Sequence, residues 1–314
     1  MTETLPTTVP GPAVPSVVEP MPRTRGPLRL ALSRLVQDRA ALAGLTIVAL
    51  AAVAALAAPL LAPYSPLATH FDAGLQGPNH QYLLGTDNLG RDELSRILYG
   101  ARVSLASITV GALAIMLIGV TVGLVSGYYG GIVDNLIQRV IEILMAFPSL
   151  VLALAIAGVL GPSMRNVLIA VVAVHWVGYA RLVRGMVLSA RSEPYVEAGR
   201  AVGARDLRIM FRQILPNVFS PIIVLLTLEM GALLLTISSL SFLGLGAQPP
   251  TAEWGNMLNQ ARPFFQSHPH LMIVPGSAIT LTVLGFNLLG DGLRDALDPR
   301  AARLVGRRRL RRAR

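Results

Sequence analysis

Six apolar stretches, each long enough to cross a bilayer as a helix, constrain this 314-residue chain more than any other feature. A spanning helix needs about 20 mostly apolar residues. The stretches cover residues 40–62, 103–125, 143–160, 167–188, 219–240 and 271–289. Inside hydrocarbon every backbone polar group must be bonded within the structure, which leaves helices or closed barrels. Because the stretches have the length of helices, the sequence predicts an all-α membrane protein with six transmembrane helices.

The composition agrees with this fold class and excludes several functions. Charged residues make up only 14% of the chain and hydrophobic residues 53%, whereas soluble domains carry about 25% charged residues. The chain contains no cysteine and its 27 basic residues are all arginine, so it lacks the lysine of a phosphate-binding Walker loop. Metalloprotease and serine-hydrolase motifs are also absent. We expect no catalytic residues and no cofactor.

Arginine distribution predicts the orientation, because cytoplasmic loops of membrane proteins are enriched in basic residues. With both termini in the cytoplasm, 22 of the 27 arginines fall on the cytoplasmic side. The expected order is a disordered N-terminal tail (1–39), a first transmembrane helix (40–62), an extracytoplasmic loop (63–102), a five-helix core (103–293) and a basic C-terminal tail (294–314). A cleaved signal peptide is the less favoured interpretation of the first helix, because its apolar run is too long. Anionic lipid accounts for the basic tail without nucleic acid.

A polar, arginine-rich segment at residues 193–217 separates the fourth and fifth apolar stretches. Pro194 suits the first turn of a helix. Gly199 and Gly203 are four residues apart and are expected to share one face, flat enough for close approach by another surface. Pro216 is expected to end this helix just before the next span. The segment therefore predicts a small cytoplasmic helix that docks on a soluble partner, although a merely solvated loop would have a similar composition.

The order of residues in this segment resembles the EAA motif of permease subunits in bacterial ABC importers. In that family the motif forms a coupling helix that docks on the ATP-hydrolysing subunit. The residues that match the motif, and that the resemblance implies as ATPase-coupling residues, are Glu197, Ala198, Gly199, Gly203, Leu215, Pro216 and Asn217. Two positions depart from the usual pattern: Gly199 replaces an alanine, and Gln213 stands where histidine is common.

Three further blocks, at residues 84–105, 241–254 and 286–300, resemble the "C" permeases of dipeptide, oligopeptide and nickel importers. The resemblance covers roughly residues 28–300. It implies a type I ABC importer permease in the bacterial inner membrane. The implied partners are a second, related permease chain in a heterodimer, two cytoplasmic ATPase subunits and an extracytoplasmic substrate-binding protein. ATP hydrolysis would belong to those partners, and the cargo would be short peptides or nickel.

Two ionisable residues within the apolar stretches, Glu229 and His175, are candidates for the translocation path, because charge inside a membrane is costly. A hydrogen bond between neighbouring helices would explain Glu229 equally well. Glu142 is expected to pair with Arg139, three residues earlier. The five histidines are scattered, so we predict no metal site and favour peptides over nickel as the cargo.

The alternative from another class of protein is a stand-alone secondary transporter or channel. Such proteins are typically built from repeats with helices broken at corresponding positions. No internal repeat of this kind is visible in the sequence.

Overall fold

The computed structural model describes residue 33 and residues 35–297. Most of the two predicted tails therefore lies outside the described residues. The described part is helical, with no strand and one isolated bridge between Thr86 and Asp92. The prediction of an all-α fold is confirmed.

Five helices of the described part are long and apolar enough to cross a membrane. They are α2 (Arg39–Leu56), α4 (Glu93–Tyr129), α7 (Met164–Arg191), α10 (Leu215–Phe242) and α12 (His270–Leu297). The last four contain the second, fourth, fifth and sixth predicted stretches, whereas α2 ends before the first predicted stretch (40–62) does. A sixth span is formed only if the bent pair α5 (Gly131–Met145) and α6 (Ser149–Leu160) is counted as one.

The third predicted stretch, residues 143–160, is not a single helix. It contains the end of α5, a break and all of α6, and the two helices meet at 86°. Pro148 lies at the break, in an extended backbone conformation just before α6. Proline has no N–H and disfavours helical geometry in the residue before it, so the helix ends there. Hydropathy alone does not detect this bend.

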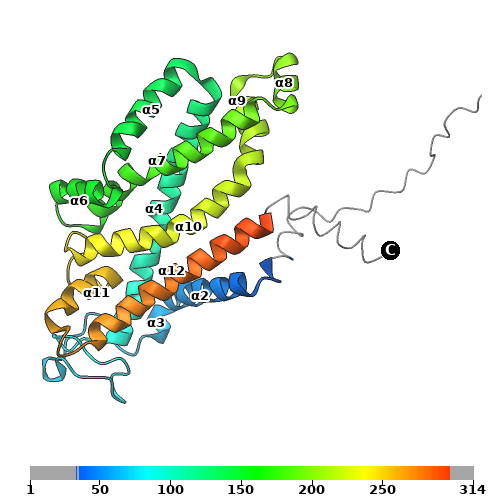
Figure 1. The fold of residues 1–314 in the computed structure, drawn as a ribbon. Coiled ribbons are helices and arrows are strands. Elements are labelled where there is room, and N and C mark those ends of the chain that lie inside the picture. Colours follow the sequence, from blue (N-terminus) through cyan, green and yellow to red (C-terminus); the bar gives the residue numbers. More distant parts are fainter. Residues whose placement is uncertain (1–32, 34, 298–314) are drawn as a thin grey trace, which may run out of the picture.

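The shorter elements connect or cover the ends of the long helices. They are α3 (Ala58–Leu61), η1 (Phe71–Ala73), α8 (Pro194–Ala201), α9 (Asp206–Ile209), η2 (Met210–Ile214), α11 (Trp254–Ala261) and η3 (Arg262–Phe264). Figure 1 shows α8, α9, the beginning of α2 and the end of α12 toward one end of the bundle, which we call the α8 end. Helix α11 and the loop after α2 lie at the opposite end, the α11 end.

A row of glycines allows α4 to pack very closely against α7. Gly119, Gly123 and Gly127 are spaced four apart on α4 and are all buried. A methyl group added at Gly123 would lie 2.6 Å from the backbone oxygen of Ala180. A methyl group at either of the other two glycines would also lie less than 3 Å from an atom of α7. Small residues at this spacing are a common way for membrane helices to approach each other, because van der Waals contact replaces the missing hydrophobic force. Helices α2 and α12 approach closely in the same way, at Gly44 and Gly285.

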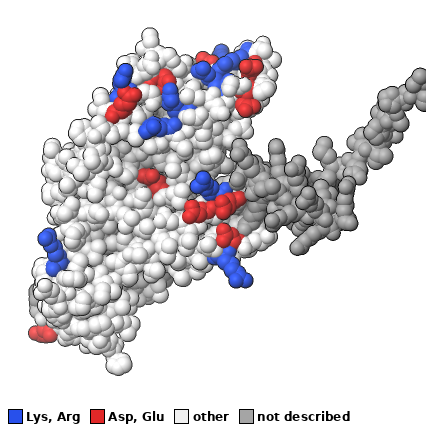
Figure 2. All heavy atoms as spheres, in the orientation of Figure 1, with Lys and Arg blue, Asp and Glu red and all other residues white. Residues whose placement is uncertain are grey.

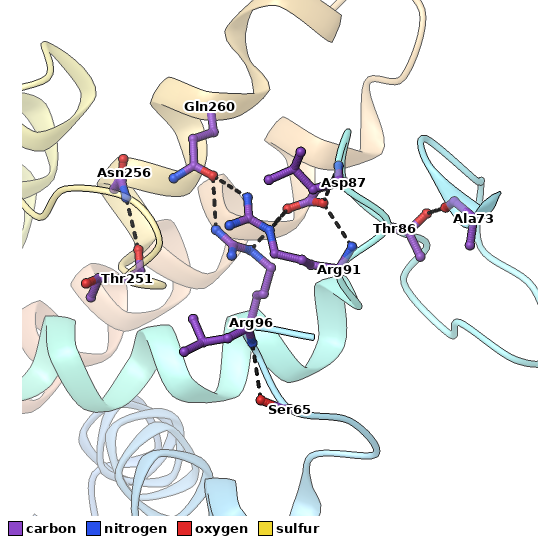
Figure 3. A network of polar contacts seen from close by, with 11 residues as sticks. Ser65, Ala73, Thr86, Asp87, Arg91, Arg96, Thr251, Asn256 and Gln260 are labelled. Atoms are coloured by element: carbon purple, nitrogen blue, oxygen red, sulfur yellow. Dashed lines mark hydrogen bonds and ion pairs between the residues drawn. The ribbon is translucent and has the colours of Figure 1, made fainter. Parts of the chain in front are cut away.

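Buried polar contacts join the loop after α2 to α11 (Figure 3). Arg91 donates from Nε to Asp87 at 2.6 Å and from Nη2 to Gln260 at 2.7 Å, while the buried Arg96 also donates to Gln260 at 3.2 Å. Glu253 caps the start of α11 by accepting from the two backbone N–H groups of Gly255 and Asn256. Burial raises the pKa of the Glu253 carboxyl. Buried polar side chains thus hold α11 against the beginning of α4, through Arg96 and Gln260.

Figure 2 shows where charged side chains lie on one face of the molecule. They gather over the α8 end, and most of the remaining surface in this view is uncharged. Many large apolar side chains are exposed, among them Leu117 on α4 and Ile132 on α5. Such a surface suits lipid or partner helices rather than water.

The α4–α7 contact generates a prediction about stability. Gly123→Ala should destabilise the protein by about 1–3 kcal/mol, because the added methyl overfills a tight contact. Gly185→Ala is the matched control on α7, since Gly185 has no atom within 4 Å of an added methyl. That control should be neutral or stabilising by up to about 1 kcal/mol, through helix propensity. Thermal unfolding in detergent measures both variants, and equal melting temperatures would contradict the packing account.

Candidate functional site

The polar segment at residues 193–217 forms a compact structure at the α8 end. Helix α8 begins after Glu193, with Pro194 in its first turn as predicted. It ends in a glycine-capped turn: the N–H of Gly203 donates to Arg200 at 2.9 Å, and the N–H of Ala204 donates to Gly199 at 3.0 Å. This pair of bonds is the Schellman pattern, which satisfies carbonyl groups at the end of a helix.

The expectation that Gly199 and Gly203 share one helical face is wrong. Gly203 lies beyond α8 with φ of +76°, a conformation that favours glycine, so its role is to end the helix. Gly199 is buried and faces Gln213, whose side-chain atoms lie 2.6 Å from an added methyl. Both glycines therefore shape the segment from within. The sequence gives the spacing of the two residues but not the position where the helix ends.

The expectation that Pro216 ends a helix is also wrong. Helix α9, the π-helical turn η2 and α10 form one continuous helical run, Asp206–Phe242. The N–H of Leu215 donates to Met210, five residues back, and Pro216 follows directly. A π turn is one way to accommodate a proline, because it shifts the backbone bonding where the proline N–H is missing. Asn217 donates its side-chain amide to the carbonyl of Gln213 at 2.7 Å.

The outer surface of the segment combines apolar and basic side chains. Glu197 and Ala198 are exposed on α8. Val202 is 84% exposed, Leu207 64% and Phe211 53%. Three exposed arginines lie among them, at positions 205, 208 and 212. We call Val202, Leu207 and Phe211 with these arginines the apolar–basic surface. Large apolar side chains exposed together in a polar segment are typical of a protein-binding surface.

Contacts with α4 and α7 hold this segment to the bundle. The Tyr128 hydroxyl, at the end of α4, donates to Asp206 at 2.6 Å. The guanidinium of Arg200 lies over the Tyr128 ring, 5.5 Å from its centre, and such cation–π contacts are attractive. Arg191, at the end of α7, donates to the Tyr128 carbonyl at 3.0 Å. A displacement of α8 and α9 would therefore pull on the ends of two long helices.

A partly buried ion pair joins α5 to α7 near the same end. Arg184 makes two bonds of 2.6 Å to the two oxygens of Asp134, and Ser126 also donates to this carboxylate. Bidentate arginine–carboxylate pairs are strong and geometrically specific. Arg184 thus pairs within the protein instead of reaching out to lipid headgroups. The role of Asp134 cannot be predicted from the sequence, because its partner Arg184 is 50 residues away and no local pattern links the two.

The structure brings together the two intramembrane candidates, His175 and Glu229. They lie near the middles of α7 and α10, and His175 Nδ1 is 2.9 Å from Glu229 Oε1. Both side chains border a hollow of about 330 Å³ beside the break between α5 and α6. The expected pair of Arg139 and Glu142 is confirmed at 2.9 Å, on an exposed face of α5. Within the described residues, no group of three or more His, Asp or Glu side chains is placed to hold a metal ion.

Comparison with known proteins gives the family. Residues 119–303 match the family of binding-protein-dependent transport system inner membrane components, and residues 26–78 match the N-terminal transmembrane domain of oligopeptide transport permease C. The first match covers more than half of the chain. The chain therefore belongs to this family and is a multi-pass permease of the bacterial inner membrane.

Individual relatives agree with the family match. A dipeptide transport system permease from Alkalihalophilus pseudofirmus is 46% identical over 87% of this chain and 90% of the relative. A glutathione transport system permease from Pectobacterium atrosepticum is 47% identical over 84% of this chain and 88% of the relative. A chain of the inward-facing MetNI methionine ABC transporter aligns with a TM-score of 0.49 at 19% identity, over 64% of this chain and 96% of that chain.

The contacts of Tyr128 generate a prediction about local order. Tyr128→Phe removes the hydroxyl bond to Asp206 and leaves the ring under Arg200. A hydrogen bond to a charged group contributes about 1.5–3 kcal/mol, so α8 and α9 should open more often. Limited trypsin digestion, read at Arg205 and Arg208, should become faster. Tyr129→Phe is the matched control, because this neighbouring tyrosine is half exposed. Equal cleavage rates in the two variants would contradict this role of Tyr128.

Proposed function

We propose that this permease subunit imports short peptides as part of an ATP-driven ABC importer. The cargo is supported by relatives named for dipeptide and glutathione transport, both of which are small peptides. Energy would come from two cytoplasmic ATPase subunits, in keeping with the absence of lysine from this chain. A second, related permease would complete the membrane path, and an extracytoplasmic binding protein would deliver the peptide. Family membership does not favour a stand-alone secondary transporter or channel.

The observation that carries this proposal is the apolar–basic surface at the α8 end. Its apolar side chains are exposed in a segment that the bundle holds in place through Tyr128. We propose that this surface faces the cytoplasm, as the arginine distribution favours, and docks on an ATPase subunit. Glu197 and Ala198 would lie at the contact. Gly203 would shape the turn after α8 rather than touch the partner.

Movement of the ATPase subunits would reach the membrane through the continuous run Asp206–Phe242 and through Tyr128. The residues Leu215, Pro216 and Asn217 lie where this run passes from the π turn into α10. We propose that they act as the junction between the docking segment and the span. Glu229 lies farther along the same helix, beside His175. These two residues would line the path whose access alternates between the two sides of the membrane.

Uptake measurements test the cargo. In a strain that lacks this gene, uptake of a labelled dipeptide should be lost and should return when the gene is restored. Uptake of radioactive nickel should be the same in all three strains, since the described residues hold no cluster of metal-ligating side chains. Loss of nickel uptake with dipeptide uptake intact would contradict the peptide proposal and make nickel the cargo.

Substitution of Leu207 tests the docking surface. Leu207→Asp places a charge in the middle of a proposed apolar contact. The few residues that dominate an interface cluster near its centre, and loss of one costs about 2 kcal/mol or more. Copurification of the ATPase subunits should fall at least tenfold, while the amount of permease in the membrane stays unchanged. Phe71→Asp is the control, because Phe71 is 73% exposed but lies at the α11 end. If both variants retained the ATPase subunits equally, the docking proposal would fail.

A further inference from the structure

We infer that His175 and Glu229 form a cation subsite in the translocation path, and that this subsite takes the protonated amino group of a peptide. The inference rests on the proposed function for the identity of the cargo. Whether a negatively charged subsite exists is independent of the cargo, because it depends only on the contacts of His175 and Glu229 and on the hollow beside them.

The pair is arranged so that the carboxylate keeps unused bonding capacity. His175 Nδ1 lies 2.9 Å from Glu229 Oε1. An ionised carboxylate can only accept hydrogen bonds, so with Glu229 ionised the N–H at Nδ1 is the donor. The other imidazole nitrogen, Nε2, is buried without a hydrogen-bond partner among the described residues. With a neutral imidazole, the pair carries one negative charge in the middle of two membrane helices.

Asp134, a largely buried acidic residue on the neighbouring helix α5, is by contrast an example of a purely structural role. Its carboxylate receives two bonds from Arg184, a side chain that is permanently charged. Within the described part of the chain, Glu229 has no arginine within ion-pair distance, and its only side-chain hydrogen bond is with His175. Asp134 is therefore paired with an arginine of the fold, whereas no arginine of the described residues pairs with Glu229.

The hollow beside the pair supplies room for a ligand. Its volume is about 330 Å³, near the lower end of the range for small-molecule sites. Apart from the pair, its lining is apolar except for one hydroxyl side chain: Leu144, Met145, Phe147, Ser149, Val174 and Val177. Of the described residues, Glu229 is the one carboxylate that lines this hollow, whereas Arg181 contacts the lining residue Met145 at 3.0 Å. Both side chains of the pair are partly exposed, at 15% for His175 and 18% for Glu229.

The chemistry of the pair favours an ammonium group over a metal ion. One carboxylate and one imidazole are fewer ligands than transition metals usually take in proteins. No third metal-ligating side chain joins them among the described residues. An ammonium group carries three donors and a single charge, so a carboxylate satisfies its charge and part of its bonding. The apolar walls suit the rest of a small peptide.

Cysteine reactivity tests the subsite, because the chain has no native cysteine. In the assembled importer, Ser149→Cys places a thiol in the hollow. A positively charged methanethiosulfonate reagent should modify this thiol about tenfold faster than a negatively charged one, as expected for a charged cleft that concentrates counter-ions. Adding Glu229→Gln should bring the two rates close together. Glutamine can still accept from His175, so this change removes the charge and keeps the hydrogen bond.

Glu142→Gln is the matched control, since it removes an exposed carboxylate from the neighbouring helix α5. The rate ratio should be unchanged in that variant. If Glu229→Gln left the ratio unchanged, or if neither reagent reached the thiol, the subsite would be ruled out. Both outcomes are independent of whether the importer carries peptides, since the reagents themselves are the probe.

A second arm tests the ligand class. A dipeptide with a free amino group should slow modification of the Ser149→Cys thiol by the cationic reagent, and the N-acetylated dipeptide should not. Equal protection by both peptides, or none by either, would overturn the assignment to the amino group. Dipeptide uptake by the unmodified importer, measured alongside, shows separately whether the proposed cargo is correct.

Discussion

The close contact between α4 and α7 is the interaction on which the other parts of this protein depend. In a bilayer the helices gain little hydrophobic energy from meeting, so shape complementarity must hold them together. The glycines at 119, 123 and 127 bring the α4 backbone against that of α7. Helix α7 carries His175 and Arg184, and Tyr128 lies in the last turn of α4. The same contact thereby places the intramembrane pair, the ion pair with Asp134 and the anchor of the α8 end.

Two acidic residues illustrate how the fold separates structural roles from functional ones. The carboxylate of Asp134 is paired with arginine, which fixes the position of α5 against α7. Among the described residues, the side chain of Glu229 hydrogen-bonds only with a histidine, beside a hollow. Burying a charge without a full counter-charge is costly, and proteins usually retain such groups where they serve a ligand or a path. The difference in partners supports the different roles that we propose.

The long helices could be predicted from the sequence because their backbone bonds are local. Hydropathy over about 20 residues therefore locates a span. The expected pair of Arg139 and Glu142 is confirmed because its two residues are also close in the sequence. The bend at Pro148 was missed, since a run of apolar residues continues across it. The role of Gly203 was also missed, because helix endings depend on backbone bonds that residue spacing does not reveal. Contacts between distant helices, such as Arg184 with Asp134, leave no local pattern in the sequence.

We propose that the ATPase subunits dock at the α8 end of the bundle. Photo-cross-linking from Val202 in the reconstituted importer tests it most directly, because this side chain is 84% exposed and lies beside the turn at Gly203. The account predicts adducts with an ATPase subunit whose yield changes when ATP binds. Adducts with the extracytoplasmic binding protein, or no adduct with any subunit of the importer, would contradict it.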